Sequence, residues 1–230
     1  MGVEACLAIE ADSELELVGK GKRGDDLANA LKESKAEVAV DLTTAEVGFE
    51  CAKIIIASGV IPVIGTSGFT DSEVSELQKL AKAKDIGGLV VPNFAVGVVL
   101  MMKFAAEAAK YMSRVEILEA HHDKKADSPS GTAVRTAELI AASMNKQLES
   151  LPDKQIIPGA RGADIAGIKI HSMRLPGVVA QQEVRFGDEA QTLTLAHSSI
   201  HRSSFMPGVC LACKKAPELR ELLNGLEHVL

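Results

Sequence analysis

Ionisable and hydroxyl-bearing side chains gather in residues 116–132, which read EILEAHHDKKADSPSGT. Two adjacent histidines, His121 and His122, end an apolar stretch that predicts a strand. An imidazole in that place can supply a proton near neutral pH. Lys125, four residues after His121, adds fixed positive charge and a further proton donor. These residue types therefore predict a site that can deliver a proton.

The same segment ends with a pattern that predicts an anion site. Ser130-Gly131-Thr132 stands at the start of a helix expected over residues 131–144. Backbone N–H groups and hydroxyls at a helix start suit a carboxylate or a phosphate. Any one of these residues alone would fit a capped turn with surface histidines. The full set in this order favours a site that binds an anion and protonates it.

Strands and helices alternate through the first ninety residues. The pattern predicts a helix over residues 3–10, strands over 15–19, 36–42, 60–64 and 88–91, and helices over 44–58 and 71–84. Asp71 is expected to cap the last of these helices. This succession predicts a parallel sheet with helices on its faces. Ligands of such sheets bind at the carboxyl ends of strands, so the loops after Asp41, Ile64 and Val91 are candidate binding loops.

The pattern changes after Asn93. It predicts helices over residues 95–112 and 131–144, strands over 114–120, 168–174, 178–186 and 191–197, and two helices over 203–230. Consecutive strands with short links favour a largely antiparallel or mixed sheet. The fold class expected is α/β. A Rossmann-like nucleotide-binding domain would comprise residues 1–92 and 204–230, and an α+β domain for substrate binding and oligomerisation residues 93–203.

Composition argues against several classes of partner. The 230 residues carry a net charge of −6 and include no Trp and one Tyr. Nucleic acids and anionic membranes are bound by clustered cations and aromatic platforms, so neither partner is expected. No apolar run approaches the roughly 20 residues of a membrane span, and no secretory signal is visible. The expected compartment is the cytoplasm.

The four cysteines are Cys6, Cys51, Cys210 and Cys213. Cys210 and Cys213 form a CxxC pattern inside an apolar stretch that predicts a helix. No second Cys or His pair stands at the spacing of metal ligands, so buried structural thiols are favoured over a redox or metal role. No metal site is predicted.

The pattern E-I-x-E-x-H-H-x-x-K-x-D-x-P-S-G-T-A over residues 116–133 closely resembles the signature of the dihydrodipicolinate (4-hydroxy-tetrahydrodipicolinate) reductase family of bacterial and plant lysine biosynthesis. Further family landmarks occur in order and spacing at residues 41–43, 65–69 and 93–97, and at Arg174 and Glu183. The resemblance runs nearly from end to end.

The resemblance implies the reduction of 4-hydroxy-tetrahydrodipicolinate to tetrahydrodipicolinate by NADPH or NADH, in lysine and diaminopimelate biosynthesis. His121 matches the family's general acid, and Lys125 matches the partner that donates a proton or holds the developing charge. The positions that match those holding the substrate's carboxylates are His122, Lys125, Ser130, Gly131 and Thr132. Hydride addition places negative charge on the substrate, so nearby cations and N–H dipoles stabilise the transition state more than the ground state.

The resemblance also places the cofactor. The loops that match those lining the nicotinamide contain Asp41, Thr43, Gly65, Thr66, Ser67, Gly68, Pro92, Asn93 and Phe94. Near the adenosine ribose a strand-end acid usually binds the 2′-hydroxyl, whereas cations accommodate a 2′-phosphate. This chain has Lys20, Lys22 and Arg23 there and no aligned acid before Asp25, which favours NADPH over NADH. Solvated loop charges are the alternative. Family members are typically tetramers built through the sheet of the second domain, so a homotetramer is expected.

The amino terminus departs from the family pattern. Met1-Gly2 matches the end of the glycine-rich turn, and the first strand and most of that turn are missing. The pyrophosphate cradle would then lack its floor, and the sheet a central strand. Two interpretations follow: the sequence is a fragment or has a wrongly assigned start, or the chain as given binds its cofactor weakly.

Two other functions compete with the reductase. One is a non-catalytic protein that keeps the dicarboxylate pocket but has lost turnover, and the intact His121, His122 and Lys125 argue against it. The other is a different two-domain dehydrogenase, acting on homoserine or an aldehyde. That alternative leaves the histidine, lysine and Pro-Ser-Gly-Thr segment unexplained and lacks a catalytic Cys in a suitable loop.

Overall fold

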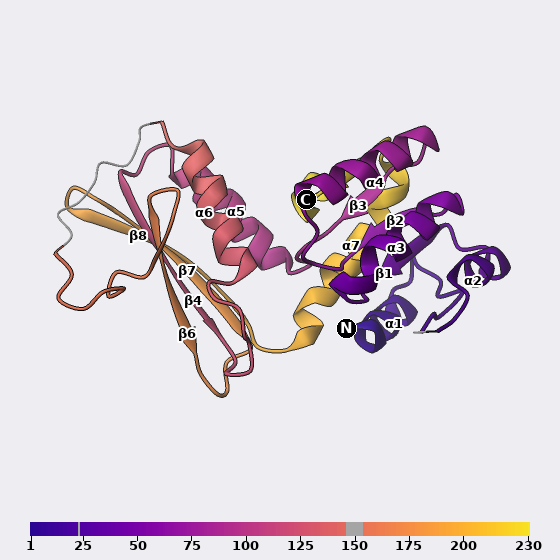
Figure 1. The fold of residues 1–230 in the computed structure, drawn as a ribbon, viewed down its shortest axis with the longest axis horizontal. Helices are drawn as coiled ribbons and strands as arrows, with labels where there is room; N and C mark the ends of the chain where they lie inside the picture. Colours follow the sequence, from indigo (N-terminus) through magenta and orange to yellow (C-terminus); the bar gives the residue numbers. More distant parts are fainter. Residues whose placement is uncertain (23, 146–153) are drawn as a thin grey trace. The chain divides into compact units, whose positions relative to one another are not determined.

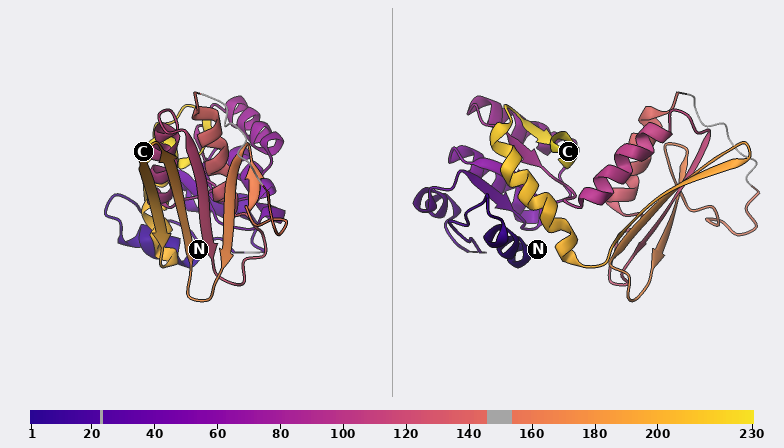
Figure 2. Two further views of the ribbon diagram at one scale, coloured as in Figure 1. Left: turned by 90° about the vertical axis from the view of Figure 1, so that its left-hand side faces the viewer. Right: turned by 180° about the vertical axis from the view of Figure 1, so that it is seen from behind.

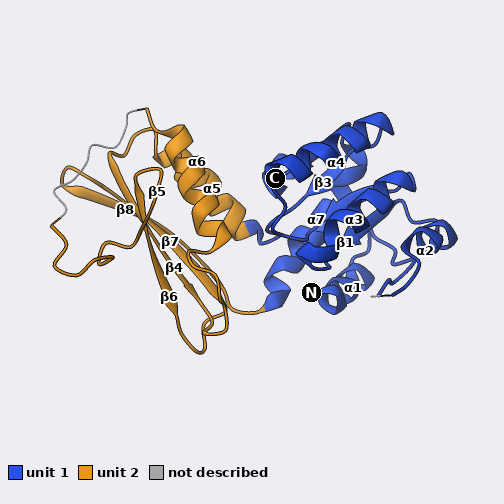
Figure 3. Ribbon diagram, viewed as in Figure 1, with its two compact units in different colours: residues 1–96, 202–230 blue, residues 97–201 orange. Residues whose placement is uncertain are grey.

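The structure is a computed structural model that describes residues 1–22, 24–145 and 154–230. The chain divides into two compact units (Figure 3). Unit 1 comprises Met1–Val96 and Arg202–Leu230, and unit 2 comprises Gly97–His201. Each unit is built around a sheet of its own.

Unit 1 contains a parallel sheet in the order β1-β2-β3-β9. Its strands are β1 (Val38–Asp41), β2 (Ile61–Ile64), β3 (Gly88–Val90) and β9 (Leu222–Asn224), and every neighbouring pair is parallel. The helices are α1 (Gly2–Ala11), α2 (Leu27–Ser34), α3 (Ala45–Ala57), α4 (Asp71–Ala83) and α7 (Met206–Lys215). Helices α3 and α4 lie on one side of the sheet and α7 on the other (Figures 1 and 2). The predicted Rossmann-like parallel sheet is confirmed.

Burial explains why these short strands form. Val63, Ile64 and Leu89 are completely buried, as expected where helices cover both faces of a parallel sheet. On α3, Ile55 and Ile56 belong to the same hydrophobic cluster as Ile64. Helix α4 begins at Asp71, so its cap lies one residue earlier than predicted. Thr70, rather than Asp71, is the capping residue, in a reciprocal box with Glu73.

Two sequence-based predictions for unit 1 are wrong. Residues 15–19 are no strand, because they pair with no other strand in the described part of the chain. Residues 203–230 form more than two helices: α7 is followed by a 3-10 turn (Ala216–Glu218), strand β9 and a second 3-10 turn (Leu226–Val229). Pro217 ends α7, since a proline has no backbone N–H to continue the helical hydrogen bonds. β9 then pairs with β3, a long-range contact that local sequence does not encode.

Unit 2 contains a five-stranded mixed sheet in the order β5-β6-β4-β7-β8. The strands are β4 (Arg114–His121), β5 (Ala163–Ile165), β6 (Ile168–Arg174), β7 (Ala180–Asp188) and β8 (Gln191–Ser199). β4 and β6 are parallel and the other pairs are antiparallel. Helices α5 (Val96–Ala108) and α6 (Gly131–Ser143) lie on one side of this sheet (Figures 1 and 2). The predicted mixed sheet is confirmed, and β5 is an addition to it.

Side chains of β4 alternate between the two faces of the sheet. Val115, Ile117 and Glu119 are buried, as are Ala137 and Ile140 of α6. A carboxylate buried in such a row must be compensated by hydrogen bonds and opposite charge. Glu119 is only 1% exposed, and its partners define the candidate site.

All four cysteines are free thiols. On α7, burial raises the pKa of Cys213 to about 12, so this side chain is an unreactive thiol at neutral pH. Within the described ranges, neither a helix long and apolar enough to cross a bilayer nor a cluster of three potential metal-ligating side chains is found.

Candidate active site

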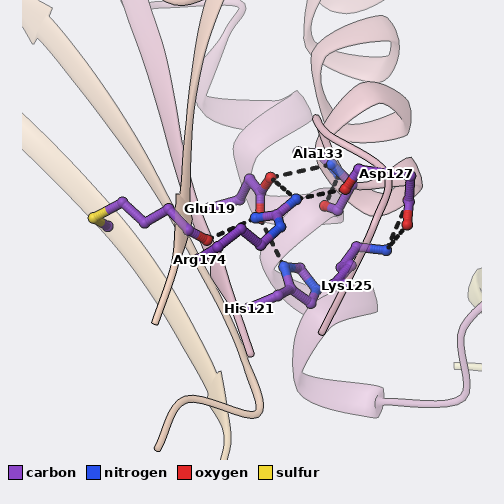
Figure 4. Close-up of polar contacts among 8 residues, drawn as sticks. Glu119, His121, Lys125, Asp127, Ala133 and Arg174 are labelled. Atoms are coloured by element: carbon purple, nitrogen blue, oxygen red, sulfur yellow. Dashed lines mark hydrogen bonds and ion pairs between the residues drawn. The ribbon is translucent and has the colours of Figure 1, made fainter. Parts of the chain in front are cut away.

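The buried carboxylate of Glu119, near the end of β4, joins several predicted site residues (Figure 4). Its Oε2 lies 2.7 Å from Nδ1 of His121. Its Oε1 accepts a hydrogen bond of 3.2 Å from the backbone N–H of Ser130. The guanidinium of Arg174 donates to both oxygens at 3.0 Å. One carboxylate thus connects the strand end, the start of α6 and the end of β6.

The charge of Glu119 follows from these partners. Burial alone would raise the pKa of its carboxyl group. Hydrogen bonds from Arg174, Ser172 and His121, together with the charge of Arg174, outweigh burial and hold the pKa below its usual value. The carboxylate is therefore ionised at neutral pH and requires a proton on Nδ1 of His121. This assigns Nε2 as the nitrogen of His121 that gains and loses a proton.

His121 is itself mostly enclosed. Burial lowers its pKa most strongly, the contact with Glu119 raises it, and the charges of Lys125 and Arg174 lower it further. The net effect is a pKa below 6.5, so the imidazole is largely neutral at pH 7. An anionic ligand beside Nε2 would favour the protonated form. Proton uptake is thus expected to accompany anion binding.

Lys125 lies in the turn after β4, close enough to His121 to influence its charge. Its ammonium is held by both oxygens of Asp127, at 2.8 and 2.7 Å. The hydrogen bond from Lys125 is also the main reason that the pKa of Asp127 is lowered. The turn itself is closed by a backbone hydrogen bond from Lys125 to His122. The structure therefore brings His121 and Lys125 together, and the ammonium of Lys125 is ion-paired with Asp127.

The Ser-Gly-Thr pattern forms the first turn of α6, as predicted. Ser130 caps this helix, since its hydroxyl accepts a hydrogen bond from the N–H of Ala133. Gly131 is exposed, and a Cβ added to it would meet nothing within 4 Å. The hydroxyl of Thr136 donates a hydrogen bond to the carbonyl of Thr132, which stabilises this turn. The positive end of this helix is thus accessible beside the Glu119 network.

His122 is exposed at the turn, and in the part of the chain that the structure describes its imidazole has no place in the Glu119 network. The alternation along β4 separates the two histidines: Glu119 and His121, two residues apart, point to the same side, whereas His122 follows the strand.

The residues predicted to line the nicotinamide lie in unit 1, at the carboxyl ends of β1, β2 and β3. The hydroxyl of Thr66 donates to Asp41 at 2.5 Å and lies 3.4 Å from that of Thr43. Asp41 and Thr66 are both buried, and their hydrogen bond joins the loops that follow β1 and β2. Gly48 at the start of α3 leaves room for this contact, because a Cβ there would overlap Thr66.

The remaining predicted cofactor residues shape the backbone of the same loops. A Cβ at Gly65 would overlap the ring of Phe94, and Gly68 has a positive φ of 96°. Asn93 accepts a hydrogen bond of 2.9 Å from the N–H of Ala95. Ser67 is exposed, while Phe94 is buried. Pro92 directly precedes Asn93 in this loop.

The predicted residues for the adenosine end are only partly described. Lys22 is exposed, and its backbone N–H donates to the carboxylate of Asp25 at 2.9 Å. Arg23 lies outside the described residues.

Sequence reasoning gave no role to Glu119 and treated Arg174 as a family landmark alone. A signal was present, because Glu119 falls in an inward position of a strand that is otherwise apolar there. Charged side chains are almost never fully buried without a partner. The partner stands 55 residues away in the sequence and becomes visible only through strand pairing.

Comparisons with known proteins agree over the whole chain. The model for the N-terminus of dihydrodipicolinate reductase matches residues 1–94, and the model for its C-terminus matches residues 97–230. The 4-hydroxy-tetrahydrodipicolinate reductase of Legionella pneumophila strain Lens is 49% identical over 230 residues, covering 100% of this chain and 95% of its own. The Bacillus licheniformis enzyme of the same name is 45% identical over 250 residues, covering 100% and 94%.

Solved structures give the same result. A dipicolinate-bound dihydrodipicolinate reductase from Paenisporosarcina sp. TG-14 superposes with a TM-score of 0.86 at 41% identity, covering 100% of this chain and 95% of that one. An amine dehydrogenase from Mycobacterium smegmatis superposes with a TM-score of 0.54 at 14% identity, covering 84% and 75%, which shows a shared fold alone.

Proposed function

The chain belongs to the dihydrodipicolinate reductase family, and we propose on that basis that its active site is the network around Glu119, with His121 as the proton donor. The protein is an NADH- or NADPH-dependent oxidoreductase that reduces 4-hydroxy-tetrahydrodipicolinate to tetrahydrodipicolinate in lysine biosynthesis. Catalysis is assigned to His121 and Lys125. The residues proposed to bind the substrate's carboxylates are His122, Lys125, Ser130, Gly131 and Thr132.

One observation supports this assignment most strongly. The carboxylate of Glu119 bonds both Nδ1 of His121 and the backbone N–H of Ser130. The proton donor and the start of the anion-binding helix are therefore fixed to a single buried group. A dicarboxylate held at the start of α6 would lie beside the imidazole that is to protonate it.

The cofactor supplies a hydride when it is bound. The loops at the carboxyl ends of β1 to β3 fit such a group, since Ser67 and Gly68 are exposed just after β2, at the sheet edge where nucleotides bind. His121 then supplies the proton from Nε2, while Glu119 keeps the proton on Nδ1 and stabilises the imidazolium. Lys125 and the first turn of α6 stabilise negative charge on the substrate.

The contact between Lys125 and Asp127 gives a first prediction. Asp127→Asn is expected to tighten the binding of pyridine-2,6-dicarboxylate about 1.5- to 5-fold, because the ammonium no longer shares its charge with a neighbouring carboxylate. Isothermal titration at low salt measures this change. Asp123→Asn removes the same charge from the same exposed turn and serves as the matched control. Weaker binding by Asp127→Asn than by Asp123→Asn would argue against Lys125 as a carboxylate ligand.

We propose that NADPH is preferred over NADH, on the strength of the cations at the adenosine end. Lys22 is exposed in this segment, and its own backbone N–H is hydrogen-bonded to the carboxylate of Asp25. Lys22→Ala is expected to lower kcat/KM for NADPH about 10-fold and to leave NADH turnover nearly unchanged, since only the former carries a 2′-phosphate. Lys32→Ala, an exposed lysine of α2, is the control. A wild-type preference for NADH would refute the proposal.

We further propose that four chains assemble through the face of the unit 2 sheet that lies opposite α5 and α6. This face mixes the apolar Leu118 and Met173 with the ion-paired Glu116 and His171. Light scattering is expected to give four times 24.3 kDa, about 97 kDa. Leu118→Arg places a cation at the centre of the face, next to Glu183, and is expected to give a folded monomer. A wild-type chain that remains monomeric would contradict the assembly.

The substrate proposed for this chain is a small dicarboxylate, in line with the dipicolinate bound to the Paenisporosarcina enzyme. We propose no nucleic-acid or membrane partner, given the net charge of −6. Four free thiols and an absence of disulfides among the described cysteines favour the cytoplasm.

A further inference from the structure

Arg174, the last residue of β6, contributes four hydrogen bonds to the site (Figure 4). Its guanidinium donates to both oxygens of Glu119 at 3.0 Å, to the carbonyl of Asp127 at 2.7 Å and to the carbonyl of Met173 at 2.6 Å. The parallel register of β4 and β6 sets Arg174 opposite His121. The side chain is 20% exposed and so largely shielded from water.

These bonds connect two segments that are otherwise joined by the hydrogen bond from the N–H of Ser130 to Glu119. One is the end of β4, where Glu119 orients His121 through Nδ1. The other is the turn that begins at Asp127, which holds the ammonium of Lys125 and leads into Ser130. A planar fork of donors bonds both oxygens of a carboxylate and a carbonyl in a fixed geometry, whereas the donors of a lysine all lie on one freely rotating nitrogen.

We infer that Arg174 is a positioning residue, which holds the proton donor on β4 and the anion-binding turn before α6 in register with each other. This inference rests on the proposed function, because it concerns the site assigned there to His121 and Lys125. Arg174 acts through Glu119 and the Asp127 carbonyl, and its own contacts are with protein groups.

Two properties of the side chain contribute separately. The shape of the guanidinium fixes the Asp127 carbonyl, and hence the turn. Its positive charge neutralises Glu119 and opposes protonation of His121, since Arg174 is among the causes that lower both pKa values. A lysine at this position keeps the charge and loses the fork, while a methionine loses both.

The test compares Arg174→Lys with Arg174→Met in the full chain. Arg174→Lys is expected to raise KM for the dicarboxylate substrate about 10-fold, because the turn is no longer bonded, with an unchanged pH dependence of kcat/KM. Arg174→Met is expected to raise KM as well and to move the pH at which kcat/KM falls upward, because the pKa of His121 rises when the nearby positive charge is removed.

Arg135→Met is the matched control, since Arg135 is an exposed arginine of α6 paired with Glu138. It should leave KM and the pH profile unchanged. Wild-type KM in Arg174→Lys would overturn the inference, and that variant remains informative if Arg174→Met does not fold. An unshifted pH profile in Arg174→Met would also count against it. If the proposed function itself were wrong, the result would differ, because His121→Gln would then be as active as the wild type.

Discussion

His121→Gln is expected to lower kcat about 10²- to 10⁴-fold, the usual contribution of a positioned general acid. Glutamine can occupy the place of the imidazole but cannot supply a proton near neutral pH. Glu119 and the start of α6 remain in place, so affinity for pyridine-2,6-dicarboxylate should change much less than kcat. Steady-state kinetics with NADPH and calorimetry of dicarboxylate binding measure the two effects.

The pH dependence follows from the direction of the pKa shift. Burial lowers the pKa of His121 below 6.5, so the protonated fraction of the free enzyme falls as pH rises through the range below 6.5. The value of kcat/KM should fall with it in the wild type, and this fall should be absent in His121→Gln. His171→Gln removes an imidazole that is paired with Glu116 at the same distance of 2.7 Å, on the opposite face of the sheet. That control should keep wild-type kcat; equal losses in both variants would show that His121 acts through folding.

Glu119→Gln is expected to reduce both stability and turnover. It leaves the largely buried charge of Arg174 without its counterion, and breaking such a pair costs about 3 kcal/mol. The new amide N–H would also face Nδ1 of His121 or the guanidinium, and either contact disfavours the present arrangement. Denaturant unfolding and kcat measure the two losses.

Acid titration distinguishes this role of Glu119 from a mere loss of packing. The pKa of Glu119 is lower in the folded protein than its ordinary value of 4.5. Its ionisation therefore stabilises the fold fully above pH 4.5, and this stabilisation is lost as pH falls through the folded pKa. Glu119→Gln should lack that loss. Glu138→Gln, an exposed position on α6, should unfold like the wild type at every pH. Similar curves for wild type and Glu119→Gln would contradict the charge assigned to Glu119.

Local sequence was sufficient for most elements of the fold. Strands β1 to β3 are short apolar runs followed by loops, and helices α3 and α4 have apolar residues at helical spacing. The wrong predictions concern segments whose secondary structure depends on pairing with a strand far away in the sequence. Residues 15–19 have strand-like composition but no neighbouring strand within the described chain, whereas Leu222–Asn224 is a strand because β3 accepts it.

The candidate site was predictable in its residues and only partly in its connections. Ser130 was expected at a helix start, and its cap follows from local rules. The role of Glu119 depends on Arg174, which the parallel pairing of β4 with β6 brings beside it. The burial of Asp41 and Thr66 likewise depends on two strands lying side by side. Sequence patterns along one segment cannot show such cross-strand contacts.

The proposed function depends most on the imidazole of His121, which should hold one proton on Nδ1 against Glu119 and exchange the other at Nε2 beside the bound dicarboxylate. NMR of the imidazole nitrogens across a pH titration, with and without pyridine-2,6-dicarboxylate, tests this directly. The predicted result is an Nδ1–H tautomer in the free protein and a rise in the pKa of His121 when the dicarboxylate binds. A neutral form protonated on Nε2, or a pKa that does not change while the ligand is bound, would contradict it.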